Sequence, residues 1–164
     1  MRLAAIGLAL LVSTAAQAEG FPVDDLTGVA GDLRAALGSG FTQKAEPKRV
    51  TLACTNCAEK PVVDVQLSRQ TDGTEQRVRS GQTTIASLKK QCQAKSPSCI
   101  VNRLDVPPAV GWISTYSMGA IAGSTAVMLR DGDMLVVRSI ASDAAVARRN
   151  AEKVVAAARK VIGN

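Results

Sequence analysis

The sequence predicts an α+β fold, an antiparallel sheet of about six strands with a C-terminal helix packed on one face and a second, shorter helix. Three observations support this prediction. Short apolar segments that alternate with a period of two recur between turn signals. The pair Asp131-Gly132 separates two such segments in the manner of a tight hairpin. Residues 144–162 repeat apolar side chains at helical spacing, and Gly163 follows them.

The first 18 residues are expected to be a secretory signal peptide. Arg2 precedes the apolar run 3–12, and Ala16-Gln17-Ala18 supplies an Ala-x-Ala cleavage site. The run is too short to cross a bilayer as a helix, which takes about 20 apolar residues. We therefore expect a periplasmic or secreted protein without a transmembrane anchor. Its formal charge of +6 is spread along the chain, so nucleic acid is not an expected partner.

Residues 19–48 are expected to form an N-terminal arm or short helix plus a linker, ahead of a single disulfide-stapled domain over residues 49–164. The helical spacing in this segment involves Leu26, Val29, Ala30, Leu33 and Leu37. Glycines at 28 and 31 oppose a helix by about 1 kcal/mol each relative to alanine. Residues 43–48, which include Pro47, are predicted as the linker.

Three strands are predicted next. Residues 49–54 form the first, and 62–67 form the second because Val63, Val65 and Leu67 alternate with polar side chains. The pair Asp72-Gly73 predicts a hairpin turn, which makes residues 75–79 a return strand at the edge of the sheet.

The shorter helix is expected to begin at Thr83 or Thr84 and to run toward Cys92. Ile85, Leu88 and Cys92 share one face of it. A strand over residues 99–106 follows. The segment 111–118 contains Trp112 and Tyr116, and residues 119–123 are predicted as a flexible link of small residues.

The hairpin over residues 124–139 has the clearest register. Its turn places Arg130 opposite Asp133 and Val127 opposite Val136. Because both faces are largely apolar, this hairpin is expected in the middle of the sheet or against a partner. The C-terminal helix over 144–162 should then bury one stripe, made of Ala147, Ala151, Val154, Val155, Ala158, Val161 and Ile162.

The sequence contains four cysteines, Cys54, Cys57, Cys92 and Cys99. An even number in an exported chain favours two disulfides, most simply Cys54–Cys57 and Cys92–Cys99, although four cysteines allow three pairings. Thiol–disulfide exchange at Cys54-x-x-Cys57 is an alternative, but no helix follows that could lower a thiol pKa. A four-thiolate metal site is a third reading, weakened by the wide spacing between Cys92 and Cys99.

The sequence supports a binding role better than a catalytic one. It has no histidine, which removes Ser-His-Asp and Cys-His sets and zinc helices, so we expect no catalytic residue, metal or cofactor. The expected function is a non-enzymatic binding or accessory module of the cell envelope that takes an unknown envelope protein or small ligand. Trp112 and Tyr116 are the candidate partner contacts, and core filling is the competing interpretation. The alternative function is a thiol–disulfide redox or metal-handling protein acting through Cys54-x-x-Cys57.

Overall fold

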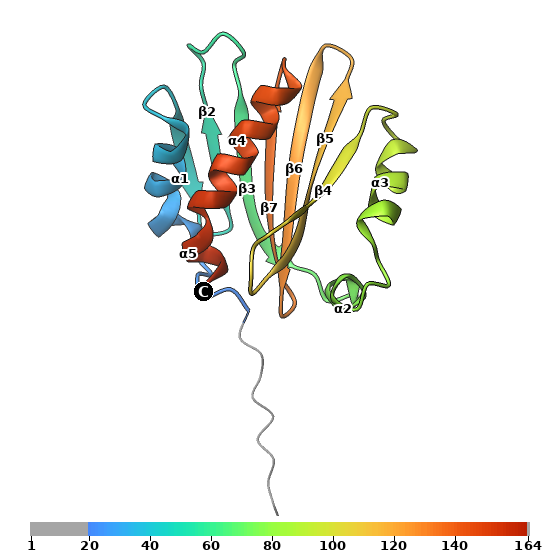
Figure 1. Cartoon of the computed structure of the whole chain (residues 1–164). Helices are drawn as coiled ribbons and strands as arrows, with labels where there is room; N and C mark the ends of the chain where they lie inside the picture. The colour runs from blue at the N-terminus through green and yellow to red at the C-terminus, as the bar shows by residue number, and fades with distance from the viewer. Residues whose placement is uncertain (1–19, 164) are drawn as a thin grey trace, which may run out of the picture.

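A seven-stranded antiparallel sheet forms the centre of residues 20–163, the part of the chain that the computed structural model describes (Figure 1). The strands lie in the order β1-β2-β3-β7-β6-β5-β4, so β3 and β7 are neighbours although they are distant in sequence. The predicted signal peptide, residues 1–18, lies outside the described residues. The strands are β1 (Thr42–Glu46), β2 (Arg49–Ala53), β3 (Val62–Arg69), β4 (Ile100–Leu104), β5 (Val110–Met118), β6 (Ile121–Arg130) and β7 (Asp133–Ala141).

The helices cover the two faces of this sheet unequally. Figure 1 shows α1 and α4 on one face, whereas α3 stands beside the β4 edge and α2 lies near the end of the β6–β7 hairpin. None of the described helices is long and apolar enough to cross a membrane. The helices are η1 (Leu26–Val29, a 3-10 turn), α1 (Ala30–Leu37), α2 (Thr74–Arg79), α3 (Ile85–Gln93), α4 (Ala144–Ala157) and α5 (Arg159–Ile162).

The core lies between the sheet and the α1/α4 layer. In β3 the side chains of Val63, Val65 and Leu67 are buried, and the residues between them point away from the helices. This alternation is the one predicted, because successive side chains of a strand point to opposite faces.

The buried stripe predicted for the C-terminal helix is confirmed, but the helix is interrupted near its end. All seven predicted side chains of the stripe are buried. The helix breaks at Ala158, where ψ is 5°, and α5 continues the chain to Ile162. Alanine at the contact points lets α4 approach the sheet closely, since alanine adds little bulk between the layers.

The β6–β7 hairpin confirms the predicted register and central position. Arg130 pairs in register with Asp133, and Val127 pairs with Val136. Positive φ angles at Asp131 (51°) and Gly132 (85°) turn the chain. The two charged residues lie opposite each other without forming an ion pair. Asp133 Oδ1 accepts from Arg69 Nη1 at 3.0 Å, and Arg130 Nε lies 3.5 Å from Asp131 Oδ2.

The sheet has seven described strands and not about six. Residues 75–79 are not among them, whereas residues 111–118 lie in strand β5 and residues 43–48, predicted as a linker, supply most of an edge strand. Lys44 pairs with Thr51 and Ala45 with Val50 across β1 and β2. Of the two forms expected for the segment before it, the short helix is present, as η1 and α1, and its Leu26 and Leu33 are fully buried.

Two further predictions are wrong. Residues 75–79 form helix α2 and not a return strand. The Asp72 carboxylate accepts from the Thr74 amide at 2.9 Å at the start of this helix, and the contact of buried Glu75 with the Gly132 amide holds the helix against the β6–β7 turn. Residues 119–123 are not a flexible link either, because β5 turns at Gly119 directly into β6, with Met118 opposite Ile121.

Candidate functional site

The face of the sheet opposite α1 and α4 has no helix over β7 and β6, and we call it the open face. Strand pairing aligns its side chains in three rows that cross β5, β6, β7 and β3. The tyrosine row is Tyr116, Gly123, Ile140 and Val62. The arginine row is Ser114, Thr125, Arg138 and Asp64. The tryptophan row is Trp112, Val127, Val136 and Gln66.

Apolar side chains on this face remain in contact with solvent. Val62 is 39% exposed, and Met118 and Ile121, which continue the same face at the tip of the β5–β6 hairpin, are 46% and 44% exposed. Trp112, Val127, Val136 and Ile140 are partly exposed. Partly exposed apolar side chains gathered on one face of a sheet are typical of interaction sites.

Tyr116 lies flat on the open face because Gly123 makes room for it. A Cβ atom at residue 123 would lie 2.7 Å from carbons of the tyrosine ring. The Tyr116 hydroxyl shares a hydrogen bond of 3.2 Å with Thr125 Oγ1. The ring is therefore fixed against the sheet, as in pairs where an aromatic residue covers a glycine of the neighbouring strand.

Trp112 lies at the bottom of a groove between the sheet and α3. The groove has a volume of about 560 Å³. Val101 and Ser114 form the floor with Trp112, and Leu88, Cys92 and Lys95 are among the residues that form the α3 side. Neither predicted contact residue is a fully buried core side chain, and both share one face of the sheet, as predicted for a strand.

The Cys92–Cys99 disulfide holds the α3 side of this groove. The bond joins the end of α3 to the residue before β4, with a Cα–Cα distance of 5.8 Å. No residue of α3 is fully buried, so packing holds this helix only weakly. A hydrogen bond of 3.2 Å from Gln93 Nε2 to the Cys99 carbonyl adds to the attachment. The disulfide therefore determines where the helix stands.

The Cys54–Cys57 disulfide closes the loop between β2 and β3, and both bonds match the simplest predicted pairing. Cys54 is 2% exposed, and its amide donates to the Pro61 carbonyl at 3.1 Å. The loop leads into strand β3, so no helix begins in the segment that follows either cysteine. The arrangement lacks the feature that most often lowers the pKa of a catalytic thiol.

Arg138 is the exposed cation at the centre of the open face. Its neighbour Asp64 accepts from Arg49 Nε at 2.7 Å and from Thr51 Oγ1 at 3.0 Å. Within residues 20–163, Arg138 forms neither an ion pair nor a side-chain hydrogen bond. Sequence reasoning missed this residue, although the hairpin register placed it between Val136 and Ile140 on one face.

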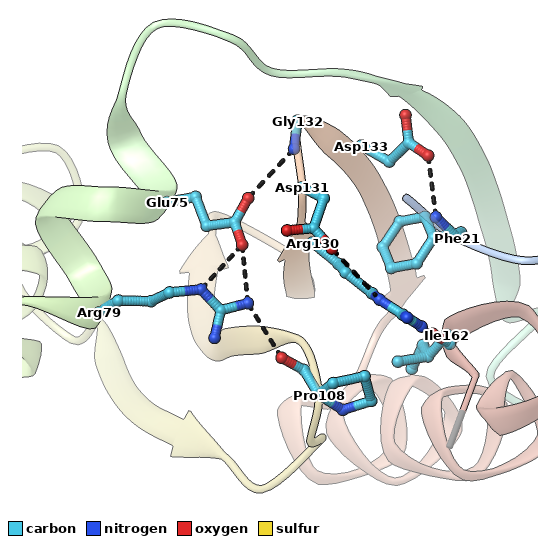
Figure 2. Close-up of polar contacts among 9 residues, drawn as sticks. All are labelled: Phe21, Glu75, Arg79, Pro108, Arg130, Asp131, Gly132, Asp133 and Ile162. Carbon is cyan, nitrogen blue, oxygen red and sulfur yellow. Dashed lines mark hydrogen bonds and ion pairs between the residues drawn. The ribbon is translucent and has the colours of Figure 1, made fainter. Parts of the chain in front are cut away.

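A second polar cluster surrounds the buried carboxylate of Glu75 (Figure 2). Its oxygens accept from Arg79 Nε at 2.8 Å and from the Gly132 amide at 3.1 Å, and Arg79 also donates to the Pro108 carbonyl at 2.9 Å. Burial raises the pKa of Glu75, but these hydrogen bonds outweigh it and leave the pKa below its ordinary value.

The Glu75 cluster is structural, because every charged group in it has a protein partner. Its neighbours in the β6–β7 turn bind both ends of the described chain (Figure 2). Asp133 accepts from the Phe21 amide at 2.9 Å, and Arg130 donates to the Ile162 carbonyl at 2.7 Å. The turn thus holds α2, the N-terminal segment and α5 together.

The described residues contain no group of three or more His, Cys, Asp or Glu side chains placed to hold a metal ion. The open face, with the groove beside α3, is therefore the best candidate site. No protein-family model matches the chain, and a search of curated proteins found no relative.

Proposed function

We propose that this protein is an exported, non-enzymatic module of the cell envelope that binds a partner on the open face of its sheet. The observation that carries the proposal is the pair of partly exposed apolar rows that run from Trp112 and Tyr116 across β6 and β7. Apolar side chains that gather on one face of a sheet and stay in contact with water are typical of interaction sites.

Two features support the proposed compartment. The first 18 residues have the pattern of a secretory signal peptide. Two disulfides, which form and persist in oxidising compartments, staple the fold. A redox or metal-handling role has less support, because the Cys54–Cys57 loop provides neither a helix N-terminus nor further metal ligands within the described residues.

Site-specific photo-crosslinking in cells tests this function. A photoreactive residue at Val136 reports on the open face, and one at Lys153, on the solvent side of α4, is the matched control. Discrete adducts are expected from position 136 and not from 153. Introducing Trp112→Ala alongside the position-136 probe should weaken those adducts, while circular dichroism shows an intact fold. Equal labelling at both positions, or none at position 136, would contradict binding on the open face.

A further inference from the structure

We propose that the occupant of the open face is an amphipathic helix of a partner protein that presents a carboxylate to Arg138. This inference rests on the proposed function and names the chemistry of the partner. It depends on three properties of the face: its charge, the spacing of its apolar rows and its position away from the strand edges.

The charge of the face requires an anionic group in the occupant. Arg138 lies between the tyrosine row and the tryptophan row and forms no ion pair with any residue from 20 to 163. Lys95, which lines the groove just past the end of α3, adds another cation, and the whole chain carries +6. Covering Arg138 with a purely apolar surface would bury an unpaired charge, which is costly.

A second copy of this chain does not supply the missing anion. A symmetric dimer through the open face would use the same surface on both copies. The one carboxylate in the three rows, Asp64, accepts from Arg49 and Thr51, both on Oδ1. Symmetry would let Arg138 of one copy meet Asp64 of the other, but each face brings Arg49, Arg138 and Lys95 against that one carboxylate. Two faces together therefore keep an excess of cations, and a different molecule is the better source of the anion.

The spacing of the rows suits a helix. Ile140 and Val136, members of the two apolar rows, are four strand residues apart, which is about 14 Å. At 1.5 Å per residue, a helix covers that distance in about nine residues, with an acidic residue near the middle. The opposite face of the same strands already packs against a helix, α4, so a second helix would complete a three-layer arrangement.

The position of the site argues against strand addition. The rows cross β5, β6, β7 and β3, which are interior strands of the sheet, and within the rows only β5 beyond Thr115 lacks a paired strand on its outer side. An added strand needs a free edge, and the open face offers side chains only.

Binding of synthetic helices tests the inference. The probe is an amphipathic peptide of about 18 residues, or five helical turns, with one central glutamate, and its partner carries lysine at that position. The fluorescence of Trp112, the only tryptophan in the sequence, reports binding to the full mature protein. We expect the glutamate peptide to bind roughly tenfold more tightly than the lysine peptide.

A charge reversal makes the test specific. Arg138→Glu should invert the preference, so that the lysine peptide binds more tightly. Arg149→Glu makes the same change of net charge on an exposed turn of α4 and should leave the preference unchanged. Circular dichroism confirms that both variants are folded.

Three results would overturn the inference. The first is equal binding of both peptides to the unaltered protein, and the second is a preference that Arg138→Glu leaves as it was. The third is binding to vesicles of anionic phospholipid, but to neither peptide, in a manner that depends on Arg138. If any of these occurs while crosslinks at position 136 persist, the partner is not a helix that presents a carboxylate to Arg138, and the binding function stands. If the crosslinks are absent, the proposed function itself is wrong.

Discussion

At the scale of single residues, the decisive feature is which charged groups have partners and which do not. Glu75 is buried, yet it accepts hydrogen bonds from Arg79 and from the Gly132 amide, so it serves stability. Arg138 is exposed between apolar rows and lacks an ion pair within residues 20–163, so it is available to a ligand. Both are single charged residues on sheet-associated elements, and only their surroundings distinguish them.

Glu75→Gln should lower the free energy of unfolding by about 1–3 kcal/mol at neutral pH, because it removes the anion that Arg79 and the Gly132 amide bind. Urea denaturation measures the change. Glu152→Gln, which alters an exposed ion pair with Arg148, is the control and should cost under about 1 kcal/mol. Equal effects of the two changes would show that the buried cluster does not stabilise the fold.

The same residue predicts a pH dependence. The pKa of Glu75 in the fold is lower than its ordinary value of 4.5. A lowered pKa means that its contribution is complete above pH 4.5 and is lost as the pH falls through the folded-state pKa. As the pH falls from 5 through the pKa of Glu75 in the folded protein, the free energy of unfolding of the unaltered protein should therefore fall further than that of Glu75→Gln. Urea denaturation at several pH values checks this, and parallel curves would contradict it.

At the scale of secondary structure elements, α3 is the weakly held one. None of its residues is fully buried, and the Cys92–Cys99 bond ties it to the start of β4. Since α3 forms one side of the groove above Trp112, the disulfide bears on the binding surface as well as on stability.

Replacing Cys92 and Cys99 together with serine should speed amide hydrogen exchange in residues 85–93 while α4 stays protected. Closing a loop of this kind typically adds about 2–4 kcal/mol to the free energy of unfolding, and here the bond restrains one helix. The paired control is the Cys54 and Cys57 double replacement, which should leave exchange in α3 unchanged. Unaltered exchange in α3 after loss of the Cys92–Cys99 bond would show that packing alone holds the helix.

At the scale of the whole molecule, residues 20–41 complete the core. Leu26 and Leu33 are fully buried, and α1 packs against α4. Leu33→Ala should therefore destabilise the protein by about 2–5 kcal/mol, as for other buried leucines. Ala35→Ser, at an exposed position of the same helix, is the control. Thermal and urea unfolding measure the stability of both variants, and equal stability of the two would contradict the prediction.

The errors of sequence-based prediction have a common physical origin. Residues 75–79 were predicted as a strand from a turn signal at Asp72-Gly73, but the buried contact of Glu75 is with Gly132, far along the chain. Residues 43–48 lack an apolar alternation because β1 is an edge strand with little burial. Its strand character comes from pairing with β2, which no local pattern reports.

The sequence alone determined what depends on neighbours along the chain. The register of β6 and β7 follows from the Asp131-Gly132 turn, and the buried stripe of α4 follows from helical spacing. The cysteine spacing favoured the two observed disulfides among three possible pairings. Only the tertiary structure decided that β3 lies beside β7. It also placed Arg138 among Tyr116, Trp112 and Val62, on a face that α4 does not cover. Strand order depends on contacts between residues distant in sequence, and local patterns do not encode them.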